Sequence, residues 1–103
     1  MRGDVHRLSS PRAPRGHEQS GGRYAVIVQS DALPLSTRLV VPTSTSARPA
    51  TFRPEIIVHG VATRALAEQA TAVDPSRLGE RVGSLGYSEL RQLDAALRIV
   101  LEL

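Results

Sequence analysis

Short apolar runs alternate with polar stretches rich in Gly, Pro and Ser along most of the chain. The run RYAVIVQS at 23–30 is the clearest predicted strand, because it is nearly all apolar and its centre is β-branched. Such a run is usually buried on both faces of a sheet. Further strands are predicted at 4–8, 38–42 and 54–59, and the segment 64–73 is interpreted as one bent strand or two short ones.

The stretches between these runs predict loops and turns. Residues 9–22 contain almost nothing apolar and predict a long surface loop, of the kind that is either functional or disordered. Residues 31–36 and 47–53 predict polar connections, and 60–63 predicts a turn. Residues 74–79 predict a turn that includes one 3₁₀ or helical turn.

The end of the chain predicts an amphipathic helix. Its apolar residues recur with the spacing of one helical face: Leu90, Leu93, Leu97, Val100 and Leu101. Ser88 is the predicted N-cap, and Glu89 suits the positive end of the helix dipole. We therefore expect a single domain over 1–103, mainly β with a C-terminal α-helix. Its five or six short strands would form a small curled antiparallel barrel against which the helix packs.

Composition excludes several classes of protein and site. The chain has no cysteine, which rules out disulfides, a zinc ribbon and a thiol nucleophile. His6, His17 and His59 stand alone and the 10 acidic residues are dispersed, so neither a metal site nor a cofactor is expected. No apolar run approaches the ~18–20 residues that span a bilayer, and no signal peptide is recognisable. A cytoplasmic protein without a membrane partner is expected.

The positive charge is concentrated in the first half of the chain. All 13 basic residues are Arg; residues 1–50 hold 7 Arg and 3 acids (7 − 3 = +4), and residues 51–103 hold 6 Arg and 7 acids (6 − 7 = −1). Arg makes bidentate contacts with phosphate, so a polyanionic partner is one explanation. Ordinary solvated cations on the surface are the other.

Two polar clusters are candidates for chemistry on a phosphodiester. In the segment 16–23, Gly21 and Gly22 permit a tight bend that folds Glu18 towards Arg23. Arg23 would stabilise charge on phosphate oxygens, and Glu18 would accept a proton or orient the Arg. A hairpin with a surface salt bridge explains the same pattern. The second cluster is the hydroxyl run 43–46, which either contacts phosphate or forms an ordinary Ser/Thr turn.

Several motifs in the same order resemble the MazF/PemK toxins of bacterial toxin–antitoxin systems. These are RGDV at 2–5, the G-x-E-Q-x-G-x-R pattern at 16–23, a strand that runs into Pro42, an E-Q pair at 68–69 on a predicted strand, and the closing helix. The resemblance implies an SH3-like barrel that forms homodimers. It also implies sequence-specific, metal-independent cleavage of single-stranded RNA, either mRNA or tRNA, which inhibits translation and growth. The 2′-OH would attack the adjacent phosphate and leave a 2′,3′-cyclic phosphate.

The resemblance assigns roles residue by residue. Arg23 would act as general acid and stabilise the phosphorane, Ser44 would supply the hydroxyl, and Glu18 would be the motif acid. The family usually has Thr at the position of Ser44, which leaves Thr43 and Thr45 open as substitutes. Glu68 is a second candidate base. The residues expected to contact RNA are Arg7, Arg12, Arg15, His17, Gln19, Tyr24 and Thr43.

Partners and competing functions follow from the same resemblance. The inhibitor expected is an antitoxin with an acidic, partly disordered segment that covers the Arg-lined surface. The same barrel class includes toxins that bind DNA gyrase and cleave nothing, but those lack the 16–23 motif. A catalytically inactive barrel that binds RNA or a partner is the third possibility.

Overall fold

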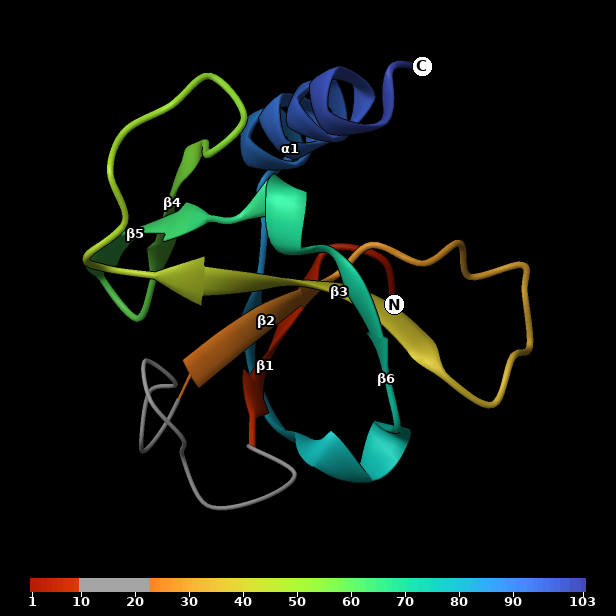
Figure 1. Ribbon diagram of the computed structural model, residues 1–103. Coiled ribbons are helices and arrows are strands. Elements are labelled where there is room, and N and C mark those ends of the chain that lie inside the picture. Colours follow the sequence, from red (N-terminus) through yellow and green to blue (C-terminus); the bar gives the residue numbers. More distant parts are fainter. Residues whose placement is uncertain (10–22) are drawn as a thin grey trace, which may run out of the picture.

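One curled antiparallel sheet and one helix account for most of the computed structural model, which describes residues 1–9 and 23–103 (Figure 1). The strands are β1 (Asp4–Leu8), β2 (Arg23–Ile27), β3 (Arg38–Ser44), β4 (Glu55–Val58), β5 (Val61–Ala65), β6 (Thr71–Val73) and β7 (Leu78–Ser84). The helix is α1 (Tyr87–Leu101), and the 3₁₀ turns are η1 (Ala67–Gln69) and η2 (Pro75–Arg77). The predicted fold class, an SH3-like antiparallel barrel with a C-terminal helix, is confirmed.

The long strand β3 connects the two halves of the sheet. The strand order is β4-β5-β3-β2-β1-β7, and β6 also pairs with β3. The first residues of β3 pair with β6, whereas its last two residues, Thr43 and Ser44, pair with β5. Because one strand changes neighbour halfway along its length, the sheet curls into the half-closed barrel seen in Figure 1.

The centre of the fold is made by β2 and β3, as their apolar runs predict. Ala25, Val26, Val40 and Val41 are all 0% exposed. β2 is shorter than the predicted strand 23–30, because the amides of Val28 and Gln29 both donate to the carbonyl of Leu39 and the regular ladder ends there.

Helix α1 covers the open side of this core. Leu93 is 0% exposed and packs in one cluster with Val26, Val41 and Ile56. The predicted apolar face of the helix is buried or partly buried over most of its length, but Leu101 is 57% exposed.

The predicted N-cap of this helix is wrong by two residues, because Gly86, and not Ser88, precedes the first helical residue. The Glu89 carboxylate accepts hydrogen bonds from the amides of Gly86 (3.0 Å) and Ile57 (2.9 Å), so it caps the helix and ties it to β4.

The structure differs from the sequence predictions at three further places. The predicted turn at 60–63 is mostly strand, because β5 begins at Val61 after a two-residue turn. The segment 64–73 holds two short strands, the end of β5 and β6, as one of its two interpretations predicted, but η1 lies between them, so Glu68 is in a 3₁₀ turn instead of on a strand. β7 was not predicted, and it raises the strand count to seven. The predicted 3₁₀ turn within 74–79 is confirmed as η2.

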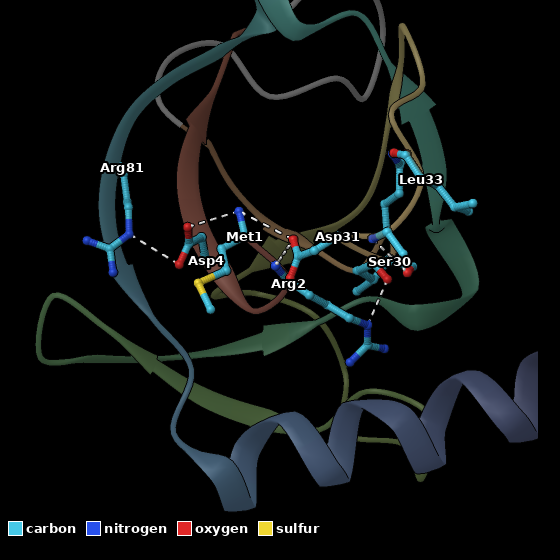
Figure 2. A network of polar contacts seen from close by, with 10 residues as sticks. Met1, Arg2, Asp4, Ser30, Asp31, Leu33 and Arg81 are labelled. Atoms are coloured by element: carbon cyan, nitrogen blue, oxygen red, sulfur yellow. Dashed lines mark hydrogen bonds and ion pairs between the residues drawn. The ribbon is translucent and has the colours of Figure 1, made fainter.

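A polar network fixes the start of β1 to β7 and to the β2–β3 connection (Figure 2). The Asp4 carboxylate pairs with Arg81 at 3.2 Å and with the amino group of Met1 at 3.2 Å, and the amide of Arg2 donates to Asp31 at 2.9 Å. Burial alone would raise the pKa of Asp4. The hydrogen bonds and positive charges of Arg81 and the Met1 amino group outweigh that effect and hold the pKa below its usual value.

Asp4→Asn is expected to lower the free energy of unfolding at neutral pH by about 1 kcal/mol, the usual upper value for such pairs. Because the folded pKa is depressed, the contribution of Asp4 is fully present above the unfolded pKa and disappears as the pH falls through the folded pKa. Urea unfolding curves of both proteins from neutral to acidic pH measure this. The unfolding midpoints of the two proteins should converge in acid.

Glu80→Gln is the matched control, because Glu80 is exposed on β7, and this variant should unfold like the parent protein. A constant difference at all pH values would contradict the assignment.

Candidate functional site

The register of β2 and β3 brings together two candidate residues that are far apart in sequence. Ala25 pairs with Pro42 and Val26 with Val41, and continuing this register towards the start of β2 sets Arg23 opposite Ser44. The Thr43 hydroxyl donates to the carbonyl of Tyr24 at 3.2 Å, which holds the two strands together at this point. Arg23 and Ser44 therefore lie next to each other at one end of the central strand pair.

A cavity of about 100 Å³ opens between these strand ends and the β4–β5 hairpin. Its lining residues are Arg23, Tyr24, Thr43, Ser44, Thr45, Val58, Val61 and Thr63. Arg23 is the one charged residue of this set. An anion that enters the cavity therefore meets a guanidinium and several hydroxyls, with no carboxylate among the described lining residues to repel it.

The Arg23 side chain is half-buried at the strand entrance. Its Nε atom is inaccessible to solvent and has no hydrogen-bond partner among residues 1–9 and 23–103. Burial of a charged donor without a partner is unfavourable, and an anion bound in the cavity would balance the charge of this guanidinium. A phosphate oxygen is the kind of acceptor that a guanidinium binds best.

The three candidate hydroxyls differ in their surroundings. Thr43 is buried, and its hydroxyl is engaged with the Tyr24 carbonyl. The Ser44 Oγ accepts a hydrogen bond from the amide of Ser46 and lies 3.2 Å from the Ser46 hydroxyl. Thr45 is exposed at the cavity edge. Ser44 and Thr45 can thus turn a hydroxyl towards a ligand, whereas Thr43 holds the strands together.

Glu68 does not line this cavity. One of its oxygens accepts two hydrogen bonds from Arg53, at 2.8 Å from Nε and 2.6 Å from Nη2. Its other oxygen is buried and has no partner within the described part of the chain. Arg53 also connects to β5, because its carbonyl accepts a hydrogen bond from Arg64. Glu68 therefore anchors the loop before β4 to η1.

Two of the residues expected to contact RNA lie together at the cavity rim. The Arg7 guanidinium is 5.4 Å from the centre of the Tyr24 ring, a cation–π distance. Arg7 is exposed and Tyr24 is half-buried. Four further RNA-contact candidates, Arg12, Arg15, His17 and Gln19, lie outside the described residues, as does the motif acid Glu18.

The β4–β5 hairpin was not singled out as part of a site by the sequence. It contributes Val58, Val61 and Thr63 to the cavity, and His59 stands at its tip, with its ring centre 5.8 Å from that of Tyr24. The available signal was the His59–Gly60 dipeptide between two apolar runs, a hairpin pattern when the two residues adopt positive φ.

Neither a group of metal ligands nor a membrane-spanning helix is found in the parts of the chain that the structure describes. No three His, Asp or Glu side chains there are grouped so that they could hold a metal ion. No helix of the described residues is long and apolar enough to cross a membrane.

Comparison with known proteins identifies the family. A family model described as PemK-like, MazF-like toxin of type II toxin–antitoxin systems matches residues 1–101. The chain is 51% identical over 73 residues to Rv3098A/RVBD_3098A of Mycobacterium tuberculosis (strain ATCC 25618 / H37Rv), whose name describes a candidate toxin; the match covers 71% of this chain and 69% of that protein.

Solved structures share the fold. An endoribonuclease in complex with its cognate antitoxin, from a mycobacterial species, superposes with a TM-score of 0.83 at 18% identity, covering 100% of this chain and 95% of that one. MazF from Deinococcus radiodurans gives a TM-score of 0.80 at 24% identity, covering 99% and 96%. With nearly the whole chain matched by the family model, this protein belongs to the PemK-like, MazF-like toxins of type II toxin–antitoxin systems.

Proposed function

We propose that this toxin is a metal-independent endoribonuclease that cleaves single-stranded mRNA or tRNA in the cytoplasm and so inhibits translation and growth. The observation that carries the proposal is the convergence of Arg23 and Ser44 in one cavity, with no carboxylate among its described lining residues. That arrangement suits a phosphodiester, which brings negative charge and several acceptor oxygens.

The proposed reaction is an internal transesterification. The 2′ oxygen of the ribose attacks the adjacent phosphorus, the bond from phosphorus to the 5′ oxygen breaks, and the products are a 2′,3′-cyclic phosphate and a 5′-OH. Arg23 donates hydrogen bonds to the phosphorane oxygens as charge builds up and delivers the proton that the 5′ oxygen takes. Ser44 positions a non-bridging oxygen.

The base that accepts the 2′-OH proton is proposed to be Glu18. Glu68, the second candidate, accepts two hydrogen bonds from Arg53 and is absent from the cavity lining. Its position therefore keeps it away from a ribose bound in the cavity.

RNA would approach the cavity over its rim. Arg7 and Tyr24 are proposed to contact it there, and Arg12, Arg15, His17 and Gln19 are proposed from the sequence alone. The Thr43 hydroxyl is engaged with a backbone carbonyl, so we assign Thr43 a role in holding β2 to β3 in place of RNA contact.

The proposed protein partners are an antitoxin and a second copy of the toxin. Structures with the same fold include an endoribonuclease in complex with its cognate antitoxin and MazE-MazF of Deinococcus radiodurans, which supports an antitoxin partner here. Apolar side chains remain exposed at the end of α1, including Ile99, Leu101 and Leu103. These exposed side chains support a homodimer. Sedimentation of the purified protein at micromolar concentration measures its oligomeric state.

Incubation of the purified toxin with a long RNA in EDTA tests the function, with the product ends mapped. Products with 2′,3′-cyclic phosphate and 5′-OH ends are expected. No cleavage, with RNA still bound, would indicate an inactive RNA-binding barrel. No cleavage and no RNA binding, together with inhibition of DNA gyrase, would indicate the gyrase-binding class.

Ser44→Ala is expected to lower the cleavage rate by about tenfold, and the double substitution Ser44→Ala, Thr45→Ala by about 10²-fold or more, if each hydroxyl partly replaces the other at the phosphate. Single-turnover cleavage of a short RNA measures both. Ser46→Ala is the control for the local turn, because Ser46 contacts Ser44 but does not line the cavity. A full loss of activity from Ser44→Ala alone would show that Thr45 does not share the role.

A further inference from the structure

The β4–β5 hairpin carries an aromatic side chain where the backbone does not need one. Val58 pairs with Val61, so His59 and Gly60 form the whole turn, with φ of 53° and 75°. Turns with two positive φ values favour Asn, Asp and Gly, which tolerate this conformation best. His also occurs at positive φ more often than most residues do, but the turn does not require an imidazole, and a non-Gly residue with positive φ is a reason to look for a function.

The position of His59 connects it to the candidate active site. Its ring lies 5.8 Å from that of Tyr24 and is inclined to it by 56°, a tilted arrangement and not a stacked pair. Tyr24 lines the cavity, as do Val58 and Val61 on either side of the turn. His59 itself is exposed, and Val61 is 54% exposed. Tyr24 and Val61 thus line the cavity that holds Arg23, and the His59 ring lies beside that of Tyr24.

We propose that His59 and Tyr24 form a subsite that binds a nucleobase next to the scissile phosphate, and that His59 contributes to the choice of cleavage site. This inference rests on the proposed ribonuclease activity. A nucleobase has a flat apolar face that stacks on aromatic rings and a polar edge that an imidazole nitrogen can contact. The Arg7 guanidinium at the Tyr24 ring supplies positive charge for the backbone of the same RNA.

The surrounding residues favour a nucleobase over an apolar peptide at this place. Arg23 and Arg7 flank the two rings, and the described lining of the cavity contains no acid. Stacked bases joined by phosphates match alternating rings and cations, whereas a purely apolar peptide would leave both guanidinium groups without a counterion.

His59→Asn is the sharpest test, because Asn tolerates positive φ and keeps the turn while removing the ring. We expect KM for a short RNA, and Kd for its uncleavable 2′-O-methyl analogue, to rise about tenfold, with kcat within about twofold of the parent value. The relative use of cleavage sites along a long RNA should also change. Tyr24→Leu should weaken binding similarly, and the double variant should be less than additive, since one base contacts both rings.

Ile57→Thr is the control, because Ile57 is exposed on the same hairpin, does not line the cavity and can be replaced by another β-branched residue. It should match the parent protein in every measurement, and circular dichroism should show that all variants fold. If the parent protein cleaves RNA while His59→Asn leaves KM, Kd and the cleavage sites unchanged, or lowers kcat alone, the subsite does not exist. If the parent protein neither cleaves nor binds RNA, the proposed function itself fails.

Discussion

Arg23→Ala is expected to reduce RNA cleavage by about 10²–10³-fold while leaving the protein folded, since the loss of one preorganised donor to a developing oxyanion has an effect of that size. Arg23 lies at the entrance of β2 and is only half-buried, outside the apolar centre formed by Ala25 and Val26. Removal of its guanidinium leaves the cavity without its one described charged group. Single-turnover kinetics on a defined RNA, with thermal unfolding of the same samples, measures both parts of the prediction.

Two matched variants make this result specific. Arg23→Lys keeps a positive charge but loses the planar fork, so it should retain a small fraction of the activity. Arg91→Ala removes an equal charge from the exposed side of α1, where Arg91 contacts Tyr87, and should cleave like the parent protein. Cleavage by Arg23→Ala at the parental rate would refute its catalytic role. Equal loss in both Arg→Ala variants would point to general electrostatic attraction of RNA.

Leu93→Ala is expected to have the largest effect on stability, a loss of about 2–5 kcal/mol in the free energy of unfolding. Leu93 is 0% exposed and belongs to the same core cluster as Val26 of β2 and Val41 of β3. Truncation would leave a cavity between α1 and the sheet that the rigid strand pair cannot close. Because Glu89 of α1 also accepts a hydrogen bond from β4, looser packing of the helix should also loosen the β4–β5 hairpin, which borders the candidate site. Urea unfolding monitored by circular dichroism measures the loss.

Ile99→Ala on the same helix provides the comparison. Ile99 is 54% exposed, so its truncation should change the unfolding free energy of the isolated chain by less than about 1 kcal/mol. Similar losses of unfolding free energy in Leu93→Ala and Ile99→Ala would mean that the buried face of α1 does not account for the packing of the helix on the sheet. A large loss at Ile99 that depends on protein concentration would instead reveal a dimer interface.

The sequence predicted the core strands and the helix well, because the patterns that indicate them lie within short segments of the chain. The β-branched run after Arg23 and the apolar residues early in β3 favour strands, since their side chains suit a buried sheet whose ladder satisfies their amides. Likewise, the spacing of Leu90, Leu93 and Leu97 indicates a helix without reference to the rest of the protein.

Elements whose stability comes from distant partners were missed. β7 has the sequence LGERVGS, with two glycines and two charges, and its pattern alone does not indicate a strand. It becomes one by pairing with β1, where register shifts near His6 allow Val5 and Leu8, three residues apart, both to reach the core. Glu68 was expected on a strand, and the ion pair with Arg53 is one contact that only the folded chain supplies.

The sequence by itself therefore determined the fold class and the residue types available for chemistry, Arg23 and the hydroxyl run 43–46. Only the tertiary structure decided which of them meet. The pairing of β2 with β3 brings Tyr24 within hydrogen-bond distance of Thr43, 19 residues away, and so places Arg23 beside Ser44. The same folding turns Glu68 towards Arg53 and brings His59 to Tyr24. Local patterns select elements, but strand register depends on contacts between residues that are distant in the chain, which no local pattern contains.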